Sequence, residues 1–252
     1  MRQPVSAHHN VAVCTDYGYK SDERGEGRWS RSPRAAGVPP DSMSGFPVAT
    51  LVLVDAATSG LVFGEAEIWE IASLEATFPE LSVRRERSWY VRPERWDEAN
   101  PISLRMHGFT RSFLERRGEP LAAVLQSFAE AVDWQRSMLA GWGVDFDKGM
   151  LTAAFRRCGL EVPFHHRVLD VRSLGFLFHA GSRRRAESLS LKGFCLWHDL
   201  GWDEGQGHLA RYRVRRTLDA LRVITQPGLA AERRQHTLAR RSSSPRPLTV
   251  RH

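Results

Sequence analysis

The sequence predicts an α/β fold in which a mixed β-sheet is flanked by helices. Three strand-like segments open the apolar part of the chain, and helical and strand-like patterns alternate after them. Turn-forming residues separate these segments. The chain has 252 residues and a hydrophobic fraction of 42%, which is enough for one substantial core.

The first three elements are predicted to be strands. Residues 50–55 (TLVLVD) form a continuous apolar run that ends in an aspartate, as is typical of a buried strand. Residues 66–78 follow with alternating apolar positions, and residues 84–93 end at a proline. Three strands in succession, before helices that alternate with further strands, indicate a mixed sheet.

Helices and short strands follow. Apolar residues at helical spacing predict a helix over residues 120–133. The later elements, in chain order, are a short buried strand (137–142), a helix (146–160), a strand that turns into a helix (167–178), a helix stopped by a glycine (188–201) and a long final helix (207–224).

The composition predicts one domain with disordered extensions. Residues 1–46 are rich in Gly, Ser, Pro and charge, which predicts a disordered arm, and residues 47–228 form the domain. Residues 229–252 carry six arginines against one glutamate, so much of the net charge of +7 lies in a basic, disordered tail. Such a tail is either simply solvated or a contact surface for nucleic acid.

The chain is expected to be a cytoplasmic protein with no membrane contact. It has no run of eighteen apolar residues, and its N-terminus lacks the apolar core of a signal peptide. Its three cysteines are scattered and form no Cys-x-x-Cys pair. Neither a disulfide framework nor a cysteine zinc site is indicated.

A lone aspartate marks the candidate site. Asp55 ends the first strand, in the stretch VDAATSG, where alanines follow it before the turn at Gly60. Binding sites in α/β proteins commonly lie at the carboxyl ends of strands. One acid without a second is unusual for a metal centre, which needs several oxygen ligands.

Six segments in order resemble the DEDDh (DnaQ-like) 3′–5′ exonucleases, over about residues 47–225. They are VDAATSGLVFGEAEIWEIAS, NPISLRMHGFT, LAGWGVDFDKGML, VLDVRSL, SLSLKGFC and GQGHLARYRVRRTLDAL. The resemblance implies a ribonuclease H-like sheet flanked by helices. It also implies four carboxylates that hold two Mg²⁺ or Mn²⁺ ions, with a histidine as general base.

Carried over by position, the resemblance leaves a damaged site. Asp55 and Asp147 stand at the first and third metal-binding acids, and His208 stands at the catalytic general base. The second and fourth acids are replaced by Ala57 and Arg213. We therefore expect a vestigial metal site that binds Mg²⁺ or Mn²⁺ only if the protein is active, and otherwise no cofactor.

The charge of Arg213 suggests a replacement for the metals. A guanidinium beside Asp55 would neutralise it and repel an incoming cation. One alternative is that Arg213 turns to solvent and leaves a weak one-metal site. Two others are that Asp219 imitates the fourth acid in a shifted alignment, and that Asp145 supplies a replacement ligand.

Four residues are candidates for contact with nucleic acid. His107 and Phe109 lie in the segment that flanks the terminal nucleotide in the resembling family, and Arg213 offers a cation. Trp142 is a candidate for base stacking, with the filling of volume at a strand end as its alternative. A buried loop anchor is the alternative for the segment around His107.

The leading hypothesis is an exonuclease-fold protein that binds single-stranded DNA or RNA, with weak or no nuclease activity. The first alternative is an active metal-dependent 3′–5′ exonuclease with an altered site. The second is a structural subunit that binds a protein partner in a nucleoprotein assembly.

Overall fold

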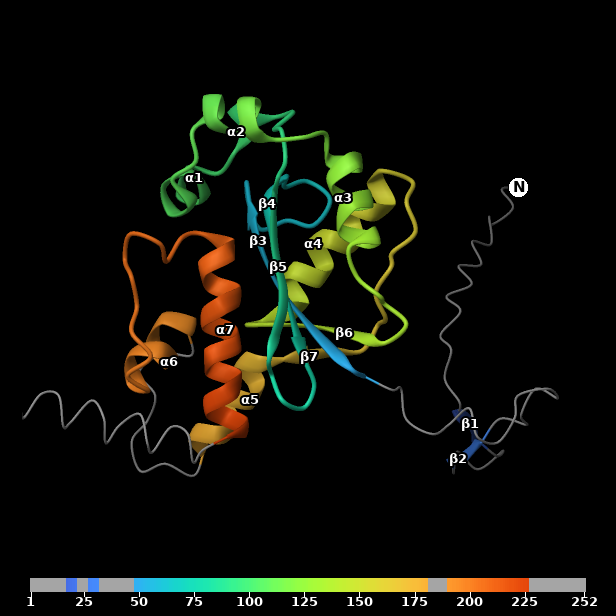
Figure 1. Cartoon of the computed structure of the whole chain (residues 1–252). Coiled ribbons are helices and arrows are strands. Elements are labelled where there is room, and N and C mark those ends of the chain that lie inside the picture. Colours follow the sequence, from blue (N-terminus) through green and yellow to red (C-terminus); the bar gives the residue numbers. More distant parts are fainter. Residues whose placement is uncertain (1–16, 22–26, 32–47, 181–189, 227–252) are drawn as a thin grey trace, which may run out of the picture. The chain divides into compact units, whose positions relative to one another are not determined.

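The structure, a computed structural model, describes residues 17–21, 27–31, 48–180 and 190–226 (Figure 1). It separates into two units, Met1–Phe46 and Pro47–His252. In the first unit, β1 (Tyr17–Ser21) and β2 (Gly27–Arg31) pair antiparallel. These two short strands lie within the arm of residues 1–46, and their sequences contain tyrosines and a tryptophan, which favour strands. The rest of the arm and the tail 229–252 lie outside the described residues.

The second unit is built on a five-stranded mixed sheet. Its strands are β3 (Thr50–Thr58), β4 (Ile68–Thr77), β5 (Val83–Tyr90), β6 (Ser137–Gly141) and β7 (Val168–Asp170). Their spatial order is β5-β4-β3-β6-β7. The β3–β4 and β4–β5 pairs are antiparallel, whereas β6 and β7 run parallel to β3. The predicted mixed sheet is confirmed.

Seven α-helices are found in the described part of this unit. They are α1 (Pro101–His107), α2 (Arg111–Arg117), α3 (Leu121–Glu130), α4 (Val144–Arg157), α5 (Val171–Ala180), α6 (Leu191–Trp197) and α7 (Ala210–Thr225), with a short 3-10 turn at Trp96–Glu98. Among the residues described, no helix has the length and apolarity needed to span a membrane.

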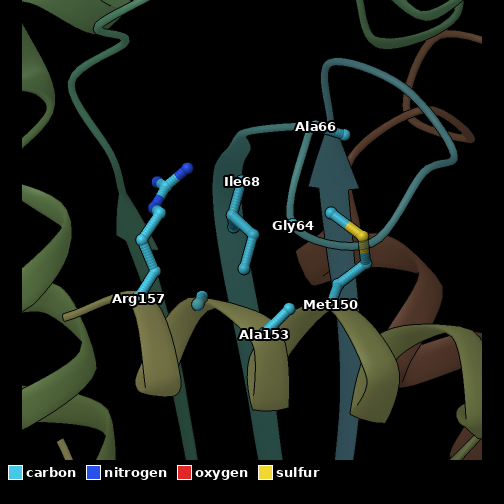
Figure 2. A pocket seen from close by; sticks show the side chains of 7 residues that line it. Gly64, Ala66, Ile68, Met150, Ala153 and Arg157 are labelled. Atoms are coloured by element: carbon cyan, nitrogen blue, oxygen red, sulfur yellow. The ribbon is translucent and has the colours of Figure 1, made fainter. Parts of the chain in front are cut away.

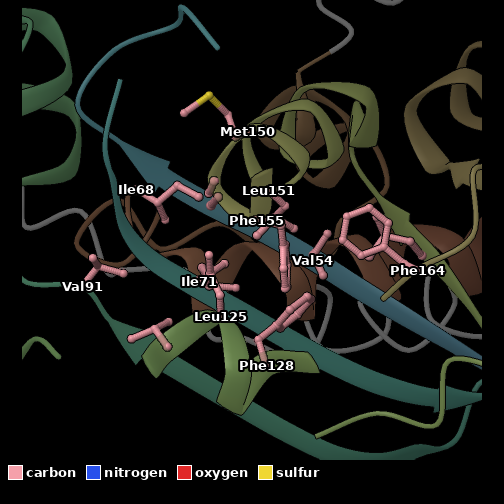
Figure 3. Close-up of a cluster of buried hydrophobic side chains, with 14 of the residues drawn as sticks. Val54, Ile68, Ile71, Val91, Leu125, Phe128, Met150, Leu151, Phe155 and Phe164 are labelled. Carbon is pink, nitrogen blue, oxygen red and sulfur yellow. The ribbon is translucent and has the colours of Figure 1, made fainter. Parts of the chain in front are cut away.

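The two faces of the sheet bury different helices. Alternating residues of β3 point to opposite faces, so Val52 and Val54 join a core with α3 and α4, whereas Leu51 and Leu53 join one with α5, α6 and α7. Figure 3 shows the first core, where Phe128 of α3 packs beside the sheet. The helices α1 and α2 lie beyond the carboxyl end of β3 (Figure 1).

The sequence did not predict α1 and α2. Each has only seven residues, too few for an apolar period to emerge. Side chains at their starts stabilise them instead: Asn100 accepts from the backbone N–H of Ile102, and Thr110 accepts from that of Phe113. The structure also shortens the helix predicted over 188–201 to α6.

Gly118, which ends α2, lies where no side chain fits. A Cβ atom there would come within 2.5 Å of the Leu114 carbonyl oxygen and 2.6 Å of the Arg92 nitrogen. Both are backbone atoms, so the clash is relieved only if the main chain shifts. We therefore expect Gly118→Ala to reduce the free energy of unfolding by about 2 kcal/mol. Thermal denaturation should show a melting temperature about 4–8 °C lower.

The matched control is Gly60→Ala. A Cβ at Gly60 would lie 3.5 Å from that of Ala66, an ordinary contact. We expect this variant to stay within about 0.5 kcal/mol of the parent protein. Equal melting temperatures for the two variants would contradict the close packing at Gly118.

Candidate functional site

The site forms where three elements meet at one edge of the sheet. Asp55 lies near the carboxyl end of β3, Asp147 in the first turn of α4, and Arg213 near the start of α7. Because β6 runs parallel to β3, the helix α4 that follows β6 begins at the same edge as Asp55. Residues 55, 147 and 213, which are far apart in the sequence, therefore converge as predicted.

Arg213 forms an ion pair with Asp55. Its Nε lies 2.8 Å from Oδ1 and 3.0 Å from Oδ2 of the carboxylate. The carboxylate is buried, and the arginine side chain keeps 34% of its surface exposed. Burial raises the pKa of Asp55 while the guanidinium opposes that shift, and Asp55 raises the pKa of Arg213. The arginine thus stands as a counter-ion on the carboxylate and does not turn away from it.

Asp147 is the second buried acid. Its Oδ1 accepts a hydrogen bond of 2.9 Å from the backbone N–H of Ala56, next to Asp55. Burial and the neighbouring Asp55 carboxylate raise the pKa of Asp147 well above its usual range. The cause is that two adjacent buried acids are hard to ionise together.

Glu70 is a third buried acid that the sequence reasoning missed. It lies on β4 directly opposite Ala57, with 1% of its surface exposed. Its carboxylate accepts hydrogen bonds from the Ser88 hydroxyl (2.7 Å) and the Ala210 backbone N–H (3.1 Å). Burial raises its pKa, and Asp55 adds to that shift. The only sequence signal was a glutamate amid the apolar residues of β4.

Glu70 fixes the start of α7. The residue before this helix, Leu209, offers no side-chain cap, so the first backbone N–H groups need another acceptor. The Glu70 carboxylate supplies it at Ala210, and a negative charge there also suits the positive end of the helix. In this way Glu70 positions both His208 and Arg213.

His107 and His208 lie next to each other. His208 is half-buried and close to Gly108, where a Cβ would lie 3.9 Å from its ring. Gly108 has a positive φ of 64°, which ends α1 and turns the chain toward Phe109. Burial lowers the pKa of His107, and a hydrogen bond with the His208 backbone opposes this. Both histidines are thus near Arg213.

The aromatic rings of this segment form a small cluster. His107 and Phe109 stack with centroids 6.4 Å apart, and both lie edge-on to the buried Trp69. Leu114 and Ala99 complete the buried part of this cluster. The segment therefore has the geometry of an anchored loop, and part of each ring remains accessible.

The other candidates lie away from the acids. The indole of Trp142 packs on Phe194, with ring centroids 5.2 Å apart, and lies close to Gly175. This geometry agrees with the alternative in which Trp142 fills volume at the strand end. Asp145 is exposed on α4 and lines a hollow on the outer side of that helix. Asp219 pairs with Arg216 and Arg222 on α7. Neither Asp145 nor Asp219 therefore replaces a missing acid.

The residues present do not fit a two-metal centre. Arg213 occupies both carboxylate oxygens of Asp55, and Ala57 offers no ligand atom. Glu70 uses its oxygens on Ser88 and α7. Within the ranges that the structure describes, no group of three or more His, Cys, Asp or Glu side chains is placed to hold a metal ion.

The sequence of this chain matches the model of one protein family. The model of the exonuclease family (RNase T) matches residues 52–195, more than half of the chain. The protein therefore belongs to this exonuclease family, with the DEDDh type of ribonuclease H-like fold. No curated protein sequence matches it.

Solved structures of exonuclease I share the fold. The E. coli enzyme with a dT13 oligonucleotide matches at a TM-score of 0.59 and 18% identity, over 72% of this chain and 42% of that one. Its zinc-bound complex with single-stranded DNA matches at 0.60 and 18%, over 73% and 42%. A complex of exonuclease I with SSB-Ct matches at 0.58 and 16%, over 73% and 43%. The chain thus spans less than half the length of these exonucleases.

The raised pKa of Asp147 leads to a test of stability against pH. The folded protein holds a proton that the unfolded chain releases at lower pH, so stability falls as the pH rises from the unfolded toward the folded pKa. Asp147→Asn keeps an oxygen for the Ala56 N–H but has no charge to bury. Because the pKa of Asp147 is raised on folding, we expect urea denaturation to show the variant gaining stability over the parent as the pH rises above about 4, near the pKa of an unfolded aspartate.

Asp145→Asn is the matched control, two residues earlier on the same helix but exposed. It replaces a carboxylate that water already solvates in the folded protein, so it should not reproduce the gain expected for Asp147→Asn. A loss of stability in Asp147→Asn at pH 8 would mean that the ionised carboxylate is the stabilising form.

Proposed function

We propose that this protein binds the end of a single-stranded nucleic acid and has weak or no nuclease activity. The observation that carries the proposal is the Arg213–Asp55 ion pair, which puts a cation where the fold family uses an acid. Ala57 stands where the family has a second acid, and this loss also favours weak or absent nuclease activity. A site of this kind keeps a positive group for phosphate without a metal.

Arg213 has donors left for an anion. Its Nε donates to the carboxylate of Asp55, whereas its terminal nitrogens Nη1 and Nη2 make no hydrogen bond with any residue that the structure describes. With a third of the side chain exposed, these nitrogens are accessible to a phosphate. An arginine held by a carboxylate is pre-oriented, so less side-chain entropy is lost when it binds.

The neighbouring groups suit a strand end. His107 and His208 lie beside Arg213, and Phe109 is a partly exposed aromatic residue on which a base could stack. The exonuclease I structures with oligonucleotides support single-stranded DNA as the ligand class. We extend the proposal to RNA, because the observed groups do not read the sugar.

An active exonuclease is the second candidate, because Asp55 and Asp147 are both retained and buried at the expected places. Mg²⁺ or Mn²⁺ would then have to displace Arg213 from Asp55. The ion pair opposes this, since the arginine would be left beside a divalent cation.

Metal-independent binding is the first test of the proposal. We expect a fluorescein-labelled oligo-dT strand to bind equally well with EDTA and with Mg²⁺, and less tightly as salt rises. The double variant Asp55→Asn/Arg213→Gln removes the cation without leaving a buried charge alone. It should bind about tenfold more weakly, with a salt slope smaller by about 0.7.

The control is Asp219→Asn/Arg222→Gln, an ion pair with an oxygen–nitrogen distance of 3.3 Å farther along the same helix. It should bind within about twofold of the parent, because it lies outside the site. Binding that requires a metal, or that the Asp55/Arg213 variant leaves unchanged, would contradict the proposal.

Rebuilding the acids is the second test. Ala57→Glu with Arg213→Asp restores four acids beside His208, and Mn²⁺ titration by calorimetry should show a sharp rise in affinity. Ala57→Glu alone should not bind metal, because Arg213 remains and the new carboxylate would be buried beside Glu70. Nuclease activity on a 3′-labelled oligonucleotide should be absent in the parent and return in part in the double variant.

Arg222→Asp provides the same charge change outside the site and should leave Mn²⁺ affinity unaltered. Robust Mg²⁺-dependent digestion by the parent protein, abolished by Asp55→Ala, would overturn the proposal and establish the active exonuclease.

A further inference from the structure

A hollow of about 380 Å³ lies on the outer side of α4, away from the acids. The ring of Phe63, from the loop between β3 and β4, forms one wall. The other wall is a single stripe of α4 that contains Asp145, Lys148, Gly149, Thr152, Ala153 and Arg156. Figure 2 shows a smaller neighbouring pocket, which Gly64 and Ala66 of the same loop line together with Ala153 of α4.

The contact between Phe63 and Gly149 is specific. A Cβ at Gly149 would lie 2.6 Å from Cζ of the ring, so only glycine lets the ring rest on the helix. Glycine inside a helix lowers its stability relative to alanine. The ring is also near Phe146, with centroids 5.8 Å apart, yet 52% of Phe63 stays exposed. The helix thus holds an aromatic ring that still faces solvent.

Polar groups surround the exposed ring. Lys148 is half-buried and oriented by a 2.8 Å hydrogen bond to the carbonyl of His166, whereas Arg156 is exposed. The Thr152 hydroxyl lies between them on the stripe, and Asp145 stands at the start of the helix. An aromatic wall with two cations, one hydroxyl and one acid is suited to a nucleotide.

The acid distinguishes a nucleotide from an acidic peptide. Asp145 would repel the carboxylates of such a peptide, but it is able to accept a hydrogen bond from an N–H group of a base, such as the ring N–H of thymine. The size of the hollow lies near the lower end of the roughly 300–1,000 Å³ found for small-ligand sites. One nucleotide, rather than a folded partner, matches this volume.

We propose that this hollow is a second nucleotide-binding subsite for a single strand. One base stacks on Phe63, and its phosphate contacts Lys148 and Arg156. The inference rests on the proposed function, because it adds a contact to the same strand. The helix α4 carries Asp147 on its buried side and the subsite on its outer side.

The test uses fluorescence anisotropy with labelled oligo-dT in EDTA at low, fixed salt. Phe63→Ala should weaken binding about tenfold, because a stacking contact is lost. Gly149→Ala should weaken it similarly, since the new methyl group displaces the ring, while thermal denaturation shows the fold retained. Phe176→Ala is the matched control: this α5 phenylalanine is 55% exposed and should leave binding within about twofold.

A strand of the same length without bases separates stacking from charge. Phe63→Ala should not change its affinity, whereas Lys148→Gln/Arg156→Gln should weaken both strands. If the parent protein binds oligo-dT and neither Phe63→Ala nor Gly149→Ala weakens it, the subsite is refuted while the proposed function stands. If the parent protein does not bind oligo-dT, both the subsite and the proposed function are refuted.

A labelled oligoglutamate peptide is the last arm. Binding of this peptide that Phe63→Ala removes, with oligo-dT affinity unchanged, would assign the hollow to an acidic protein partner and overturn the nucleotide subsite.

Discussion

The ion pair between Asp55 and Arg213 is the interaction on which the site depends. Three carboxylates, those of Asp55, Glu70 and Asp147, are buried at one edge of the sheet. Buried acids raise one another's pKa and disfavour a compact structure unless a cation or hydrogen-bond donors compensate. Arg213 compensates Asp55, and backbone N–H groups compensate the other two acids.

Each of the three acids is therefore stabilised in a different way. Asp55 lies next to a full positive charge, and burial together with Asp55 raises the pKa of Asp147. Glu70 is bound to a hydroxyl and to the positive end of a helix. The result is a group of buried acids beside a guanidinium that remains partly exposed.

The sequence predicted this arrangement as far as long-range patterns allow. The apolar strand before Asp55, the helical spacing of α3 and the order of the family-like segments placed Asp55, Asp147, His208 and Arg213 on one sheet edge. They did not reveal Glu70, because a polar residue in a strand has the same appearance whether it faces water or a helix end. They also missed α1 and α2, whose formation depends on capping by Asn100 and Thr110 and on packing around Trp69.

The capping of α7 by Glu70 affects which parts of the chain tolerate change. Because this carboxylate lies on the sheet, the start of the helix is set by β4. The connection between α6 and α7 is also bound to the helix, since the Leu200 carbonyl accepts from Arg216 and the Asp203 N–H donates to the Tyr212 hydroxyl. A change of length in this connection is therefore expected to disturb the ion pair least if it spares these two contacts.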